Sequence, residues 1–362
     1  IVRTTGQLSA IDRGLIRAAV ARINRSRYGA AYARTALCEA GMPSETVNAV
    51  LAGDDSPLDD RARRLVQFVS QLSLAGRDVT DEQVQWLRRE YGDEVTVAIV
   101  LSTAYGNFQD RLVQALGLPV EEAGPVSPSL PDNEPEASAP PRPPIPGAAA
   151  GESGPSPAVV ASFELLQERL ERQRARESRI PIPEWDEVSD RIPAGFYASG
   201  KPLEIRWSRL VVGRQPEIGG AWIKTLRMFE SESRQDRVFE ESMFWVVTRA
   251  LGCSYCMGHC EMLMEVGGLD RSAIQDRTRA LATGDWTRFS PAERTAFALA
   301  EKMTDAPWSV TDADVAALQT ALGPERALDA IWWIARCQFM TKVSDAFQLS
   351  LERENVFLGA YK

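Results

Sequence analysis

Three cysteines and the only histidine of the chain lie within eight residues of one another, in the segment CSYCMGHC from Cys253 to Cys260. The Cys-x-x-Cys step puts the thiols of Cys253 and Cys256 on one helix face, close enough to form a disulfide after modest adjustment. His259 follows three residues later on the same face. This pattern is typical of a redox or nucleophilic thiol beside a proton acceptor.

A helix break is expected just before these residues, because Gly252 follows the apolar run 239–251. A second helix would then begin at Cys253. Unpaired N–H groups and the helix dipole favour negative charge at such a start, which predicts a lowered cysteine pKa. Tyr255 is interpreted as a packing residue at this turn, since the chain has a tyrosine at the related position 28 in a segment without cysteines.

Two other readings of the cluster stay open. Cys253, Cys256, His259 and Cys260 are four potential metal ligands, but one helical turn cannot wrap them tetrahedrally around zinc, and no second Cys/His pair completes a site. The thiols can also be small buried hydrophobes. That is the interpretation given to Cys38 and Cys337, which lie alone among apolar residues.

Composition excludes several classes of protein. The 362 residues are 44% hydrophobic and carry a net charge of −9, so nothing predicts binding to nucleic acid. No apolar run approaches the ~20 residues of a membrane helix. The printed start of the chain has no secretory pattern and five cysteines do not suggest a disulfide framework, so a reducing, cytoplasmic location is expected.

A proline-rich segment divides the chain, because 11 of the 22 prolines fall between Pro125 and Pro157. Such a segment buries too little apolar surface to fold. We therefore predict a helical domain over 1–120, a Pro/Ala/Gly-rich linker over 121–160 and a second helical domain over 161–362. A tether of this kind does not require the two domains to touch within one chain.

Apolar residues recur at three- and four-residue steps in both parts, for example over 8–23, 62–74, 81–91, 315–322 and 327–336. Alternating strand patterns are scarce. The sequence therefore predicts an all-α protein.

The two parts also resemble each other. A shift of 231 residues pairs Val79-Thr-Asp with Val310-Thr-Asp, and a shift of 227 pairs Ser26-Arg-Tyr-Gly29 with Cys253-Ser-Tyr-Cys256. Tyr32 then takes the position of the histidine, so only the second copy can carry out thiol chemistry. The alternative is a chance alignment of two helical segments.

With these residues in place, the second part resembles the AhpD-like alkylhydroperoxidase and carboxymuconolactone decarboxylase superfamily. The resemblance covers about residues 205–352, with 8–117 as a degenerate copy. Pro216-Glu-Ile-Gly-Gly-Ala-Trp222 looks like the entry helix of the family. Glu241 lies twelve residues before Cys253, where the family has its relay glutamate, and Glu240 is the neighbouring fallback.

The resemblance implies an all-helical thiol peroxidase. Cys256 would attack a hydroperoxide, Cys253 would resolve the sulfenic acid as a disulfide, and Glu241 with His259 would relay protons. An external dithiol, or a lipoyl or thioredoxin-like partner, would reduce the disulfide, and no metal or other cofactor would be needed. Family members assemble as trimers or hexamers, so three two-copy chains are expected to form a pseudo-hexamer.

Two departures from the family pattern matter for the site. Many peroxidase members have histidine four residues after the second cysteine, where this chain has Cys260, which can serve as a second resolving thiol. In addition, twelve residues of straight helix span about 18 Å. A relay from Glu241 therefore needs a turn at Gly252 or a carboxylate from a neighbouring helix.

Two functions of other classes remain as alternatives. One is a lyase of the carboxymuconolactone decarboxylase branch, for which Arg249 and Lys224 are the candidate anchors of an acidic lactone. The intact cysteine pair argues against it. The other is a non-catalytic assembly protein, with the degenerate copy as architecture or as a changed binding pocket around Ser26, Arg27, Tyr28 and Tyr32.

Overall fold

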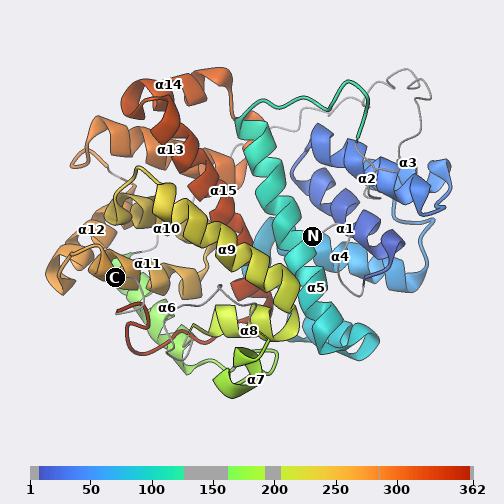
Figure 1. Ribbon diagram of the computed structural model, residues 1–362, viewed down its shortest axis with the longest axis horizontal. Helices are drawn as coiled ribbons and strands as arrows, with labels where there is room; N and C mark the ends of the chain where they lie inside the picture. The colour runs from blue at the N-terminus through green and yellow to red at the C-terminus, as the bar shows by residue number, and fades with distance from the viewer. Residues whose placement is uncertain (1–7, 126–161, 192–204, 285, 359–362) are drawn as a thin grey trace.

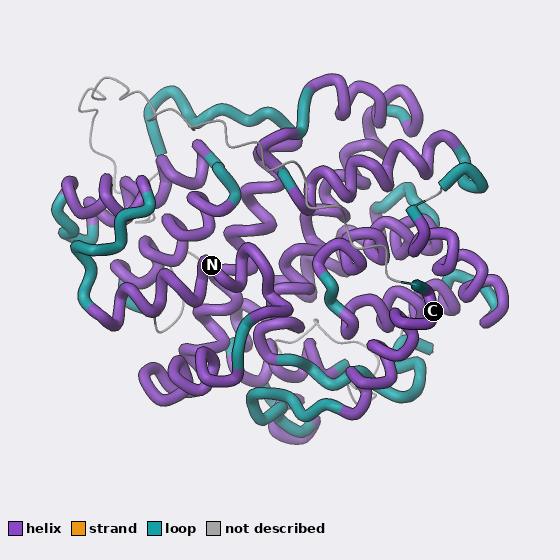
Figure 2. The backbone as a smooth tube through the Cα atoms, turned by 180° about the vertical axis from the view of Figure 1, so that it is seen from behind, coloured by secondary structure: helices purple, strands orange, loops and turns teal. Residues whose placement is uncertain are grey.

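The computed structural model describes residues 8–125, 162–191, 205–284 and 286–358, and these residues form an all-α protein (Figure 1). No strand occurs among them, and the tube in Figure 2 is helix joined by loops wherever the chain is described. The predicted all-α class is thereby confirmed. No helix within these ranges is long and apolar enough to span a membrane.

The first half of the molecule, residues 8–125, contains five α-helices and a short 3₁₀ turn. They are α1 (Ala10–Ile23), α2 (Arg27–Glu39), α3 (Ser44–Ala52), α4 (Asp60–Ala75), η1 (Gly76–Asp78) and α5 (Asp81–Ala115).

The second half, residues 162–358, begins with α6 (Phe163–Ala175), α7 (Trp185–Ser189), α8 (Arg206–Arg214) and α9 (Pro216–Glu232). The remaining elements are α10 (Arg237–Leu251), α11 (Ser254–Val266), α12 (Arg271–Thr283), α13 (Pro291–Asp305), η2 (Pro307–Ser309), α14 (Asp312–Leu322) and α15 (Pro324–Phe347).

Local sequence explains where the central helices begin and break. Thr80 and Thr311 accept hydrogen bonds from the backbone three residues ahead and start α5 and α14 with matching capping boxes. Gly92 interrupts α5 with φ 77° and ψ 168°, and Gly323 separates α14 from α15 with φ 82° and ψ 160°. Glycine fits both breaks because residues with a Cβ rarely adopt this positive φ.

The order of packed elements is alike in the two halves. In the first half α1 packs against α2, α4 and α5, and in the second α10 packs against α11, α13 and α15. This is the order that an internal repeat requires, and the repeat itself stays a prediction. Residues 126–160 of the predicted linker lie outside the described residues.

The two halves touch through their longest helices. Helices α5 and α15 lie side by side at the centre of the molecule, and the buried apolar side chains of both halves form one continuous core (Figure 1). The proline-rich tether did not require this contact, and the structure shows that the two halves make it. Apolar faces on both helices gain more from burial against each other than from solvent exposure.

Candidate functional site

The predicted cysteine turn is present between α10 and α11. Gly252 ends α10 in the left-handed region with φ 74°, and Cys253 is the N-terminal cap residue of α11. The Cys253 amide donates to the Thr248 carbonyl at 3.0 Å, which closes the turn. A Cβ at Gly252 would lie 2.9 Å from Cδ of Arg77, so this turn is also pressed against η1 of the first half.

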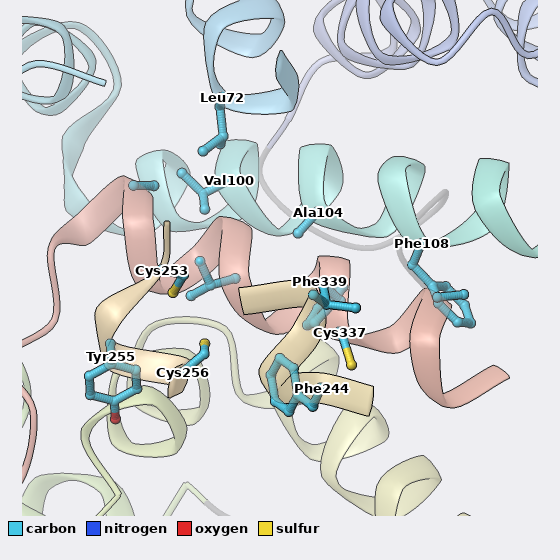
Figure 3. Close-up of a cluster of buried hydrophobic side chains, with 14 of the residues drawn as sticks. Leu72, Val100, Ala104, Phe108, Phe244, Cys253, Tyr255, Cys256, Cys337 and Phe339 are labelled. Atoms are coloured by element: carbon cyan, nitrogen blue, oxygen red, sulfur yellow. The ribbon is translucent and has the colours of Figure 1, made fainter. Parts of the chain in front are cut away.

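Both thiols of the Cys-x-x-Cys pair are free and buried. They lie next to each other at the start of α11, in the apolar cluster shown in Figure 3. Cys256 Sγ is 3.3 Å from Oγ of Ser344 on α15. The Ser344 hydroxyl donates to the Met340 carbonyl at 2.9 Å, so it accepts from the Cys256 thiol in this arrangement.

The electrostatic setting of Cys253 differs from the prediction. Burial raises the pKa of the Cys253 thiol well above its ordinary value, with Cys256 and Asp345 adding to the effect. A helix start was expected to lower it. The N-terminal charge of α11 is outweighed because this thiol has no contact with solvent, and desolvation penalises the thiolate.

His259 is held by a carboxylate that the sequence reasoning did not find. Its Nε2 lies 2.7 Å from Oε2 of Glu352, which belongs to the C-terminal segment after α15. The other oxygen of Glu352 accepts from the Tyr255 hydroxyl at 3.1 Å and from the Arg206 amide at 2.8 Å. Tyr255 is therefore more than a packing residue, because its hydroxyl is part of the network that holds Glu352.

Glu352 is ionised in this network. Burial opposes its charge, but His259 and the hydrogen bonds from the His259 ring and the Arg206 amide outweigh burial and hold the pKa of Glu352 below its ordinary value. An ionised carboxylate only accepts hydrogen bonds, so Nε2 of His259 carries the proton between them. In neutral His259 this leaves Nδ1 as the basic nitrogen of the ring.

The predicted pair of Glu241 with His259 is not formed. Glu241 is fully buried on α10, and neither of its carboxylate oxygens has a hydrogen-bond partner among the described residues. Burial raises its pKa to about 7, against the opposing effects of Arg336 and Arg237. The turn at Gly252 reverses the chain as the relay required, but the Nε2 edge of His259 faces the C-terminal segment instead of α10.

Glu240, the predicted fallback, does not replace Glu241. It accepts a hydrogen bond from the Ser233 hydroxyl at 2.6 Å and lies 3.6 Å from the Arg237 guanidinium. Burial raises its pKa above the ordinary value. The side chain is thus engaged at the start of α10, away from the thiols.

The remaining cysteines fall into two environments. Cys260 and Cys337 are buried next to Glu241, and burial raises the pKa of each thiol. The Cys337 thiol donates to the Trp333 carbonyl at 3.0 Å, and its predicted burial is confirmed. Cys38 is exposed, so its prediction as a buried thiol is wrong. It is on the outer face of α2, which the apolar neighbours in sequence did not indicate.

The site is closed to bulk solvent. Cys256 and His259 expose 3% and 6% of their surface, and the Phe357 ring packs edge-on against the His259 ring at 5.0 Å. Asn355 fastens the same C-terminal segment to α11, by donating to the Met262 carbonyl at 2.7 Å. A substrate must therefore displace part of this cover to reach Cys256.

The structure gives less support to a metal site or to an anchor for an acidic lactone. Within the described residues, no three Asp, Glu, His or Cys side chains are grouped so that they could hold a metal ion. Arg249, a candidate anchor for a lactone acid, donates to the Leu281 and Ala282 carbonyls and pairs with Glu301. Lys224, the other candidate anchor, is exposed on α9.

The first half contains a related arrangement without thiols. The Tyr28 hydroxyl donates to Glu121 at 2.7 Å, and its ring stacks on Tyr32 at 4.7 Å. In the second half, Tyr255 bonds Glu352 and packs against the His259 ring at 4.3 Å. Comparison with known proteins adds no assignment, since neither a family model nor a curated protein matches the chain.

Proposed function

We propose that this protein is a thiol-dependent peroxidase of the AhpD-like type, with Cys256 as the attacking thiol and Cys253 as the resolving thiol. The observation that carries the proposal is the pair of adjacent free thiols at the α10–α11 turn, beside a histidine fixed by an ionised glutamate. A structural cysteine pair has no need of a histidine hydrogen-bonded to the ionised Glu352 in the same buried region.

The proposed reaction has two steps. Cys256 loses its proton to His259, and the thiolate attacks a hydroperoxide, so that an S–O bond forms and the O–O bond breaks. The alcohol leaves with the proton from His259, and Cys256 is left as sulfenic acid. Cys253 then attacks this sulfur, and a disulfide and water are formed. An external dithiol, or a lipoyl or thioredoxin-like protein, restores both thiols by exchange.

Glu352 replaces Glu241 in this proposal as the partner of the histidine. By accepting from Nε2–H, it orients the ring and keeps Nδ1 available for proton transfer. The Ser344 hydroxyl, now accepting from the Cys256 thiol, can turn and donate to the thiolate once the proton has left.

The test is consumption of tert-butyl hydroperoxide with dithiothreitol as reductant. We expect Cys256→Ser to lose turnover to the uncatalysed rate, and Cys253→Ser to accumulate sulfenic acid instead of the disulfide. Cys38→Ser is the matched control, because this exposed thiol lies in the first half. Wild-type consumption by the Cys256→Ser variant would refute the proposal.

A further inference from the structure

A second carboxylate, besides that of Glu352, lies near the thiol pair. The Cys253 thiol is against the carboxylate of Asp345, which follows Ser344 on α15. Oδ2 of Asp345 is buried and has no hydrogen-bond partner in the described part of the chain. Serine and aspartate are adjacent in sequence and contact different thiols, so α15 supplies one polar group to each cysteine.

The first half of the molecule covers this carboxylate. A Cβ placed on Gly76 of η1 would lie 3.1 Å from Oδ2 of Asp345, so the backbone of η1 approaches it closely. Lys342, one turn earlier on α15, is fully buried and donates to the Ser73 carbonyl of α4 at 2.9 Å. The first half thus closes the site around Cys253 and fixes the position of the neighbouring cation.

Four groups face Asp345 from the surrounding elements. They are the Cys253 thiol, the Lys342 ammonium on its own helix, Arg77 on η1 and Arg179 in the segment after α6. Arg179 is held in place by donating to the Asp345 and Ala346 carbonyls at 3.2 and 3.1 Å. The three basic side chains oppose the effect of burial, which on balance raises the pKa of Asp345 to about 6, so that its carboxylate is largely ionised at pH 7 beside a protonated thiol.

We propose that Asp345 is the proton acceptor for the resolving thiol Cys253, in a site that the first half completes through Ser73, Gly76 and Arg77. The inference rests on the proposed peroxidase function and extends it to the second step. A resolving thiol needs such a group here because burial keeps Cys253 protonated.

Asp345 takes the proton of the Cys253 thiol while Cys253 Sγ attacks Sγ of the Cys256 sulfenic acid. The S–S bond forms, the S–O bond breaks, and hydroxide leaves with the proton that Asp345 accepted, as water. The two sulfur atoms are oxidised to the disulfide by the oxygen that the hydroperoxide delivered to Cys256.

The experiment separates the two steps in the full-length protein. One equivalent of tert-butyl hydroperoxide is added to the reduced protein, dimedone traps Cys256 sulfenic acid, and intact mass follows disulfide formation. For Asp345→Asn we expect sulfenic acid to form at the wild-type rate and disulfide closure to slow by about 10²-fold, as for loss of a general base. Asp345→Glu should restore most of the closure rate.

Glu261→Gln is the matched control, since burial also raises the pKa of this carboxyl on α11 and its partner is Gln167. The Glu261→Gln variant should form the Cys253–Cys256 disulfide at the wild-type rate. Equal closure rates in Asp345→Asn and wild type, with sulfenic acid formed in both, would overturn this inference and leave the peroxidase proposal standing. Absence of sulfenic acid in the wild type would overturn both.

The pH dependence of Cys253–Cys256 disulfide formation distinguishes a proton acceptor from a purely structural residue. A structural role for Asp345 would change the rate without changing its pH dependence. Burial, opposed by Lys342, Arg77 and Arg179, raises the pKa of Asp345 to about 6. Closure in the wild type should therefore rise as pH passes about 6. In Asp345→Asn the rise should move above pH ~8.5, the ordinary pKa of a thiol, because burial raises the pKa of Cys253 further. If Asp345→Asn does not fold, a wild-type rise only above pH ~8.5 overturns the inference.

Discussion

At the scale of single residues, the position of one glutamate decides how the histidine can work. Glu352 bonds His259, Tyr255 and the Arg206 amide at once, so its charge is stabilised by three donors. Glu241 accepts no hydrogen bond among the described residues and has only the Arg237 guanidinium at 3.6 Å, so it is the more weakly stabilised anion, as its raised pKa indicates. The carboxylate that supports the histidine is thus the one with the larger number of donors.

We expect Glu352→Gln to lower the free energy of unfolding by about 1–3 kcal/mol at pH 7, because a buried charged acceptor is lost. The pKa of Glu352 is depressed in the folded state, so its contribution is present above the unfolded pKa of about 4.3 and is lost as pH falls further. Urea unfolding at pH 7 and pH 3.5 should therefore show a difference between wild type and variant that shrinks in acid.

Peroxide turnover of Glu352→Gln should fall at least about tenfold, the equivalent of about 1.4 kcal/mol in the barrier. Glu121→Gln is the control, since Glu121 bonds Tyr28 in the first half as Glu352 bonds Tyr255 in the second. A variant at Glu352 that is as active as the one at Glu121 would show that His259 works without this carboxylate.

Much of the site was predictable from the sequence, and Glu352 was within reach. The shift of 231 residues that pairs Val79 with Val310 also pairs Glu121 with Glu352, and both segments carry a tyrosine that bonds the glutamate. The family resemblance pointed to Glu241 instead. Ser344 and Asp345 give no local signal, because their role depends on how α15 crosses α11.

At the scale of elements, the turn between α10 and α11 places both thiols. Gly252 is left-handed, and its missing Cβ leaves room for Arg77 of η1. The break after α10 could be predicted from glycine following an apolar run, and so could the α-helices themselves from apolar periodicity. Sequence could not show that η1 packs on this turn, because the contact joins positions about 175 residues apart.

We expect Gly252→Ala to cost about 1–2 kcal/mol, since alanine is strained in the left-handed region. It should also displace Arg77 and Cys253 and slow closure of the Cys253–Cys256 disulfide. Gly53→Ala is the control, because Gly53 caps α3 with φ 98° and its nearest neighbour is 3.8 Å from a built Cβ. Urea unfolding should give a loss for Gly252→Ala at least as large as that for Gly53→Ala, and mass analysis should find slower closure only at Gly252. Equal closure rates would contradict the positional argument.

At the scale of the whole molecule, the two halves exchange a pair of reciprocal hydrogen bonds. Arg111 on α5 donates to the Thr304 carbonyl of α13 at 3.1 Å, and Lys342 on α15 donates to the Ser73 carbonyl of α4 at 2.9 Å. The two donors, Arg111 and Lys342, are 231 residues apart, and so are the two acceptors, Ser73 and Thr304, which is the shift of the predicted repeat. Reciprocal contacts of this kind are what the predicted repeat would give if its copies packed as in an isologous dimer.

The two cations differ in how strongly burial affects them. Burial lowers the pKa of Arg111 to about 10, and burial together with Arg111 lowers that of Lys342 to about 7. An unfolded lysine has a pKa of about 10.4. Between pH 7 and pH 10 the unfolded chain therefore binds the proton that folded Lys342 releases, and the contribution of Lys342 makes the fold more stable as pH rises.

Comparison of two methionine variants isolates this effect. The free energy of unfolding of wild type minus that of Lys342→Met should rise from pH 7 to pH 9, by up to about 1.4 kcal/mol per pH unit. The same difference for Arg111→Met should stay flat, since Arg111 remains charged in both states over this range. Asp345, Arg77 and Cys253, which face Lys342, are present in both proteins. If the two differences changed with pH in parallel in urea unfolding, burial in the interface would not lower the pKa of Lys342 more than that of Arg111 enough to affect stability.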